Sequence, residues 1–115
     1  MALSEFEIKR IEKTMDAFMA KRRPPAHIRK DLDLVYRLKN QSVEIFEVRP
    51  DWQDSSHIME HPVAKMTYVK TQKIWKLFWQ RADLKWHGYE PYPFGKTLEE
   101  CLDVIDKDVH CCFWG

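Results

Sequence analysis

The sequence predicts a single α+β domain, in which a mainly antiparallel sheet of five strands carries an N-terminal and a C-terminal helix on one face. Three observations support this prediction. The 115 residues match the length of one domain, residues 1–115. Helical periodicity follows a capping signal near each end of the chain. Between these two regions, apolar and polar residues alternate as they do in strands.

The first helix is expected over residues 5–22. Ser4 and Glu7 have the spacing of a capping box, in which each side chain satisfies the other's backbone N–H. Pro24 and Pro25 end the helix, because a residue before proline avoids the helical conformation. The apolar stripe of this helix consists of Ile8, Ile11, Met15, Phe18 and Met19.

The second helix begins at a similar capping signal, Thr97 with Glu100. Its apolar stripe consists of Leu98, Cys101, Leu102 and Ile105. The tail that follows is apolar, and we expect Phe113 and Trp114 to pack on the body of the fold or on a second copy of the chain. Three cysteines in a short chain do not indicate a disulfide framework.

Five segments between the helices read as strands. Residues 32–39 and 42–49 form a predicted hairpin around Asn40-Gln41. Pro50 ends the second strand, and the polar segment Asp51–Pro62 is expected to be a long loop. Three more strands follow at residues 63–70, 74–81 and 84–89.

An even-length turn at Ala82-Asp83 would place Trp79 opposite Trp86 and sort the last three strands into two faces. An odd-length turn would flip the last strand. The expected core face consists of Val63, Val69, Trp75, Leu77, Trp79, Leu84 and Trp86. The opposite face, mixed aromatic and basic, consists of Met66, Tyr68, Lys76, Phe78, Gln80, Lys85, His87 and Tyr89.

The mixed face gives the leading functional hypothesis, a non-enzymatic binding module for nucleic acid or for an acidic protein surface. The candidate binding residues are Lys70, Lys76, Arg81, Lys85, His87 and Tyr89. Basic and aromatic side chains in this combination are typical of nucleic-acid contacts. The competing interpretation is an ordinary solvated sheet face, in which Arg81 bridges Asp83 or Glu90.

Two other functions stay open. His87 and Tyr89 beside basic residues are compatible with a small endoribonuclease of the toxin type, which cleaves RNA by general acid–base chemistry. The second open function is that of a structural homodimer, joined through the Phe113-Trp114 tail. No catalytic signature appears in the chain, so the sequence leaves enzymatic activity undecided.

Metal and cofactor sites are not expected. Glu44, Glu47 and Arg49 resemble the strand of a metal-dependent nuclease only in outline, because arginine stays protonated and cannot act as a base. His57 and His61 have the spacing of a helical metal pair, but their segment does not read as a helix. Cys111 and Cys112 follow His110 directly, and adjacent residues rarely bind one metal together.

Charge and composition favour a cytoplasmic protein. The formal net charge is only +1, which argues against strong non-specific binding to nucleic acid. However, the segment from Lys65 to Glu90 contains six basic residues and only two acidic ones. No apolar run is long enough to span a bilayer, and the first residues lack the order of a signal peptide.

The chain also resembles a small bacterial family known as domain-of-unknown-function family 3024. The resemblance covers nearly the whole chain. It rests on SEFEIKRIEK (4–13), KRRPP (21–25), SVEIFEVRPDW (42–52), PVAKMTYVKTQKIWKLFWQRADLKWHGYEP (62–91), TLEECLDVIDKD (97–108) and the terminal CFWG. It supports the one-domain interpretation and implies no activity, because the family has no assigned function.

Overall fold

The computed structural model describes residues 3–54 and 56–114, so Ser55 of the predicted loop and Gly115 of the tail lie outside the described residues. The predicted fold class is confirmed. The helices are α1 (Glu5–Arg22) and α2 (Leu98–Lys107). The strands are β1 (Asp33–Lys39), β2 (Ser42–Pro50), β3 (Ile58–Val69), β4 (Ile74–Gln80), β5 (Trp86–Gly88) and β6 (Phe94–Gly95).

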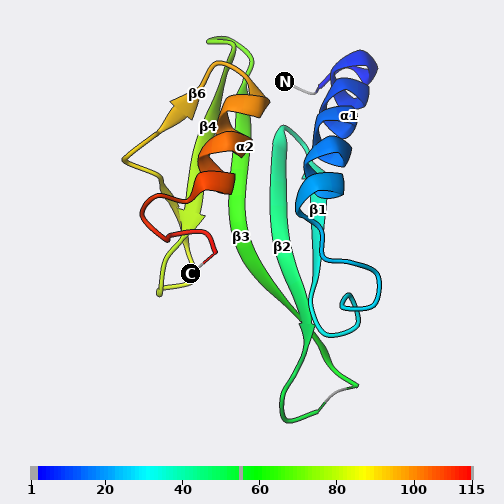
Figure 1. Ribbon diagram of the computed structural model, residues 1–115. Coiled ribbons are helices and arrows are strands. Elements are labelled where there is room, and N and C mark those ends of the chain that lie inside the picture. The colour runs from blue at the N-terminus through cyan, green and yellow to red at the C-terminus, as the bar shows by residue number, and fades with distance from the viewer. Residues whose placement is uncertain (1–2, 55, 115) are drawn as a thin grey trace.

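The sheet is antiparallel throughout and follows the order β1-β2-β3-β4-β5, while the two-residue strand β6 pairs with the same edge of β4 as β5 does. Figure 1 shows both helices on the same side of this sheet, α1 over β1 and α2 over β3 and β4. The opposite side carries no helix of the described chain. We call this uncovered side the open sheet face.

The core lies between the helices and the sheet. Both predicted helical stripes are confirmed apart from Ile8, which is only half-buried. The capping box of Ser4 and Glu7 is complete, whereas only half of the second one forms: Thr97 Oγ1 accepts from Glu100 N–H. The Glu100 carboxylate accepts from the Lys96 N–H instead. Hydrophobic burial on this face supplies the main stabilising free energy of the fold.

The predicted loop Asp51–Pro62 was wrong over its second half. β3 begins at Ile58, and residues 58–62 pair with the end of β2, so that the connection spans only residues 51–57. Pro50 is the last residue of β2 and pairs with Ile58, so the strand ends at this proline as expected. A polar sequence is compatible with this hairpin extension, because its side chains are largely exposed and need no apolar pattern.

A β-bulge in β3 changes which of its residues face the core. The register shifts between Ile45 and Phe46, so that Val63 is the extra residue of β3. Val63 and Ala64 are therefore both buried, and Met66 and Tyr68 follow on the core side. The prediction that Met66 and Tyr68 lie on the opposite face was wrong for this reason.

The register of the last strand was also predicted wrongly. Gln80 pairs with Trp86 and Trp79 pairs with His87, so the connection contains the five residues 81–85, an odd number. Leu84 adopts a left-handed backbone conformation with φ 62° in this turn. The flip moves Trp86 to the open sheet face and turns His87 to the helix side. Leu84, expected in the core, is exposed instead.

The C-terminal tail packs on its own domain. Asp108 has a left-handed backbone, and its carboxylate accepts hydrogen bonds from the N–H groups of Cys112, Phe113 and Trp114. Phe113 is buried against Tyr89, with ring centroids 4.8 Å apart. The first of the two predicted tail positions, docking on the body of the fold, is therefore confirmed.

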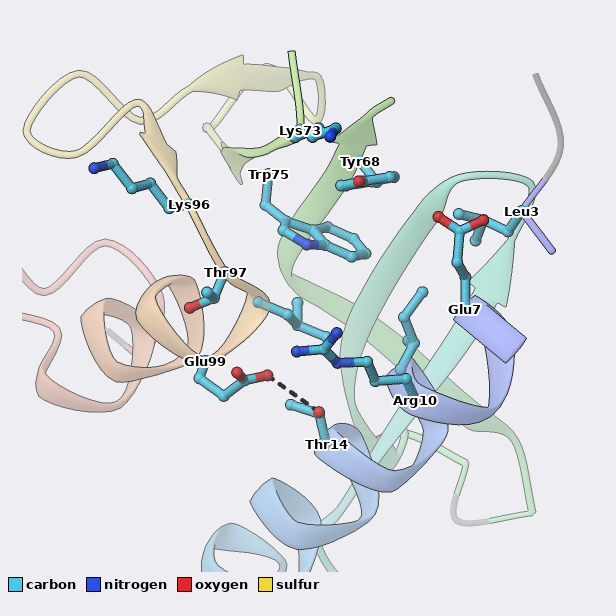
Figure 2. A pocket seen from close by; sticks show the side chains of 12 residues that line it. Leu3, Glu7, Arg10, Thr14, Tyr68, Lys73, Trp75, Lys96, Thr97 and Glu99 are labelled. Carbon is cyan, nitrogen blue, oxygen red and sulfur yellow. Dashed lines mark hydrogen bonds between the residues drawn. The ribbon is translucent and has the colours of Figure 1, made fainter. Parts of the chain in front are cut away.

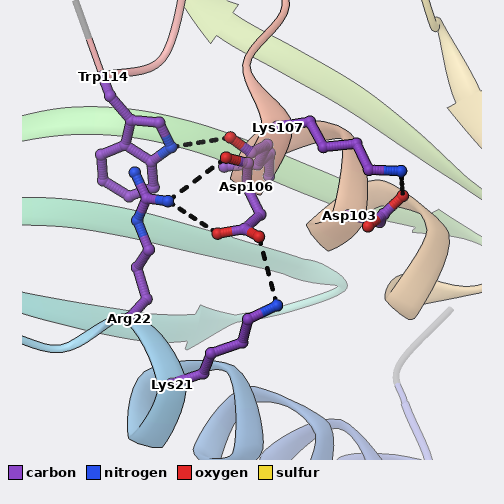
Figure 3. A network of polar contacts seen from close by, with 7 residues as sticks. Lys21, Arg22, Asp103, Asp106, Lys107 and Trp114 are labelled. Atoms are coloured by element: carbon purple, nitrogen blue, oxygen red, sulfur yellow. Dashed lines mark hydrogen bonds and ion pairs between the residues drawn. The ribbon is translucent and has the colours of Figure 1, made fainter.

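Figure 3 shows the polar network that joins the tail to both helices. The Trp114 indole N–H donates to the Ile105 carbonyl, and the Arg22 guanidinium stacks over the indole ring at 4.2 Å. Arg22 also donates to Asp106 at 2.7 Å, and Lys21 donates to the same carboxylate at 3.4 Å. The network ties the end of α1, the end of α2 and the tail into one unit.

Candidate functional site

The structure does not gather the six predicted binding residues on one face. Lys76 alone among them lies on the open sheet face, where it is exposed. Lys70 forms an ion pair with Glu7, 3.2 Å between Nζ and Oε1. Tyr89 is only 2% exposed, and burial raises the pKa of its hydroxyl.

Arg81, Lys85 and His87 lie in or beside the 81–85 turn. The Asp83 carboxylate organises this turn: it accepts from the Lys85 N–H at 3.0 Å and lies 2.8 Å from the His87 ring nitrogen. These two interactions lower the pKa of Asp83. Arg81 lies over the Trp79 ring at 5.6 Å. The competing interpretation expected Arg81 to bridge Asp83 or Glu90, but the residue that contacts Asp83 is His87.

A different cluster occupies the open sheet face, and it centres on Lys65 of β3. The Lys65 ammonium lies 5.6 Å from the centroid of the Phe78 ring and 5.9 Å from that of the Trp86 ring. Lys65 pairs with Phe78 across the strands, and Trp86 stands beside Gln80 on the next strand. Both rings are half-buried, so each keeps part of its surface in contact with solvent.

Two further side chains extend this cluster along the same face. Lys76 lies two residues before Phe78 on β4, and its cross-strand partner on β6 is Phe94. Phe94 is half exposed, so part of its ring is accessible on this face. We call Lys65, Lys76, Phe78, Trp86 and Phe94 the aromatic-lysine cluster.

At the other end of the open sheet face, around β1, the positive charge of Arg37 is compensated by an ion pair. Arg37 forms an ion pair with Glu60 and lies over the Phe46 ring at 4.9 Å. Glu44 stands between Arg37 and Lys65 in the cross-strand row. Among the described residues, Lys65 and Lys76 form no ion pair. The aromatic-lysine cluster thus holds two lysines without an ion-pair partner, although Glu44 lies next to Lys65 across the strands.

Of the five cluster residues, the sequence predicted Lys76 and Phe78 for this face, whereas Lys65, Trp86 and Phe94 were missed. Trp86 was assigned to the core, because the turn before it was counted as even. Lys65 was passed over, because its neighbours on β3 were sorted without the bulge. Its position between the apolar residues Ala64 and Met66 was the available signal, since a lysine there points away from a core that holds both neighbours.

Metal-binding groups are scattered. Among residues 3–54 and 56–114, no three His, Cys, Asp or Glu side chains lie close enough together to hold a metal ion. His57 lies in the connection and His61 inside β3. Cys111 is exposed, and Cys112 is half-buried.

The fold and the cluster define a class: a small α+β domain whose antiparallel sheet is covered by helices on one face and carries an aromatic and basic cluster on the other. More particularly, the chain belongs to the family described as Domain of unknown function (DUF3024), whose model matches residues 3–115. No curated protein and no solved structure matches the chain. In the described part of the chain, neither helix is long and apolar enough to cross a membrane.

Proposed function

We propose that the protein is a non-enzymatic binding module for single-stranded nucleic acid and that it binds through the aromatic-lysine cluster. The observation that carries the proposal is the Lys65 ammonium above the rings of Phe78 and Trp86 on a face without a covering helix. Bases stack on aromatic side chains of this kind, and adjacent cations contact the phosphates.

The arrangement favours a single strand over a duplex. A duplex hides the faces of its bases in the helical stack and presents mainly phosphates, so the rings of Phe78, Trp86 and Phe94 would have nothing to stack on. Binding to a duplex would then depend on charge, and the net charge of +1 supplies little of it. A single strand exposes both its bases and its phosphates to the same surface.

An acidic protein surface is the less suitable partner. It would engage the ammonium groups of Lys65 and Lys76 but would leave the aromatic rings without a specific role. Of the other predicted binding residues, Lys85 is exposed in the 81–85 turn next to Trp86, so it can extend the contact to the backbone of a longer strand. Arg81 lies over the Trp79 ring on the helix side and takes no part in this contact. Tyr89 has no place in it, because it is buried against Phe113.

The burial of Tyr89 also lowers the support for a ribonuclease. The pair of His87 and Tyr89 was the basis of that alternative, and a tyrosine that is 2% exposed does not reach a phosphodiester group. His87 faces the helix side, away from the aromatic-lysine cluster. We therefore propose binding without catalysis.

The charge component of the proposal is tested by the salt dependence of oligonucleotide binding. Fluorescence anisotropy of labelled oligo-dT and oligo-U should show saturable binding at low salt. For two lysine–phosphate contacts, the logarithm of the affinity should fall against the logarithm of salt concentration with a slope of about −1.4. Lys65→Gln should reduce that slope by about half. The matched control is Lys107→Gln, because Lys107 is an exposed lysine on α2.

Competition separates the two partner classes. Unlabelled oligo-dT should displace the labelled strand, whereas polyglutamate at equal charge should not. Displacement by polyglutamate at the same concentration would show that the surface recognises negative charge alone and would favour an acidic protein partner. Absence of any binding to either oligonucleotide at low salt would contradict the proposal as a whole.

A further inference from the structure

A pocket of about 230 Å³ opens on the helix-covered side of the molecule, between the N-terminal halves of α1 and α2 (Figure 2). The turn between β3 and β4 forms its third wall, through Lys73. The pocket is separate from the open sheet face, because the sheet lies between them. Its volume is below the roughly 300–1,000 Å³ of typical drug-sized sites, so a ligand as large as a nucleotide would extend out of its mouth.

One side of the pocket is aromatic. Tyr68 and Trp75 are cross-strand neighbours on β3 and β4, with ring centroids 5.1 Å apart and planes inclined at 41°. Trp75 is 6% exposed and lies centrally among the pocket residues in Figure 2. The two rings together form a surface on which a flat group can pack.

The charges around the pocket are unbalanced. Arg10, Lys73 and Lys96 line it, and in the described part of the chain none of their side chains makes a hydrogen bond or an ion pair. The lining also holds two carboxylates. Glu7 caps α1 and pairs with Lys70, whereas Glu99 accepts from the neutral Thr14 hydroxyl at 3.1 Å and keeps its charge. Three cations therefore stand against one uncompensated carboxylate. The Arg10 guanidinium extends toward the space between the helices in Figure 2.

We propose that this pocket binds a small anion that carries a flat ring, either a nucleoside monophosphate or an aromatic carboxylate. The ring packs against Trp75 and Tyr68, and the anionic group accepts hydrogen bonds from Arg10. A guanidinium is suited to this role because it presents two parallel N–H groups to a phosphate or a carboxylate. Lys73 and Lys96 add positive charge at the mouth.

The test is a titration followed by ¹H–¹⁵N NMR with three probes: adenosine 5′-monophosphate, phenylacetate and inorganic phosphate. At millimolar concentration, at least one ring-bearing probe should cause saturable shifts of the Trp75 indole signal and of the Thr97 and Leu98 amides. Arg10→Ala should weaken that binding about fivefold or more. Lys9→Ala, the neighbouring exposed cation outside the pocket lining, should leave it unchanged.

The outcomes distinguish a phosphate-bearing ligand from a carboxylate-bearing one. Saturation by the nucleotide alone identifies a phosphate ligand, and saturation by phenylacetate alone identifies a carboxylate ligand. Inorganic phosphate binding as tightly as both would overturn the proposal, because the ring would then contribute nothing. Equal binding by the wild type and Arg10→Ala would overturn it too, as would the absence of saturable shifts with every probe. Trp86→Ala, on the open sheet face, should leave the titration unchanged, so failure here is distinguishable from failure of the oligonucleotide proposal.

Discussion

Lys65 and Phe78 are cross-strand partners on the open sheet face, and the Lys65 ammonium lies 5.6 Å from the centroid of the Phe78 ring. The core fixes this relationship. The chain neighbours of Lys65, Ala64 and Met66, are both completely buried on the helix side. A slip of one residue would drive the lysine into the core and expose Met66, which is strongly unfavourable. Burial on one face therefore holds the cluster in place on the other.

The carboxylate of Asp108 holds the C-terminal tail. Asp108→Ala should lower the free energy of unfolding by about 1–3 kcal/mol, because three backbone N–H groups lose their acceptor. Urea unfolding gives this value, and hydrogen exchange should show faster exchange at the amides of residues 112–114. Asp103→Ala is the matched control, since its exposed pair with Lys107 should contribute less than about 0.5 kcal/mol. Equal effects of the two substitutions would refute the role of Asp108.

The two glycines in strands should respond oppositely to alanine. At Gly95 an added Cβ would lie 3.0 Å from Cys101 Sγ and 3.2 Å from a backbone oxygen. Gly95→Ala should therefore cost about 1–3 kcal/mol by overpacking. At Gly88 an added Cβ meets nothing within 4 Å, so Gly88→Ala should be neutral or stabilise by up to about 1 kcal/mol. Thermal unfolding of both variants checks the pair, and a stable Gly95→Ala protein would show that α2 is not packed this closely.

Asp106 should make part of the stability pH-dependent. Burial raises its pKa, but the hydrogen bonds from Arg22 and Lys21 outweigh burial and leave the pKa lowered. Its contribution is therefore fully present above the unfolded pKa of about 4 and is lost as the pH falls through the lower folded value. Asp106→Asn should cost about 1–2 kcal/mol at neutral pH. Urea unfolding at several pH values should show that difference shrinking below pH 4, and a difference constant down to pH 2 would contradict the assignment.

The three thiols should differ in reactivity. Burial raises the pKa of Cys101 to about 12, and its sulfur contacts the Trp75 carbonyl at 3.7 Å. Alkylation requires an accessible thiolate, so iodoacetamide should modify the exposed Cys111 first and Cys101 only on unfolding. Peptide mass spectrometry over time gives the order. Early modification of Cys101 would show that the helix side of the core opens readily.

The helices were predictable because their signals are local. Ser4 with Glu7, and Thr97 with Glu100, mark starts that depend only on residues three apart, and each apolar stripe repeats over several turns. The hairpin at Asn40-Gln41 was also predicted, and its two-residue loop is confirmed by the pairing of Lys39 with Ser42.

The face assignments failed because they depend on single-residue irregularities. The bulge at Val63 directly follows Pro62 inside β3, and a proline in a strand is typical of a bulge, but this signal was read as the end of a loop. Leu84 adopts a left-handed conformation that normally requires glycine or asparagine, so its sequence concealed the odd-length turn. Each irregularity reverses every later side chain on its strand. Lys65 and Trp86 were missed for this reason, although the basic and aromatic composition of the region was evident.

The most direct test of the central claim compares two tryptophans. Trp86 belongs to the aromatic-lysine cluster, whereas Trp52 is 89% exposed in the 51–57 connection. Stacking of a base on an aromatic ring is worth about 1–3 kcal/mol. Trp86→Ala should therefore weaken binding of labelled oligo-dT by about fivefold to a hundredfold, while Trp52→Ala should leave the affinity unchanged. Loss of affinity in Trp52→Ala with none in Trp86→Ala would place the binding surface at the β2–β3 connection and contradict the proposal.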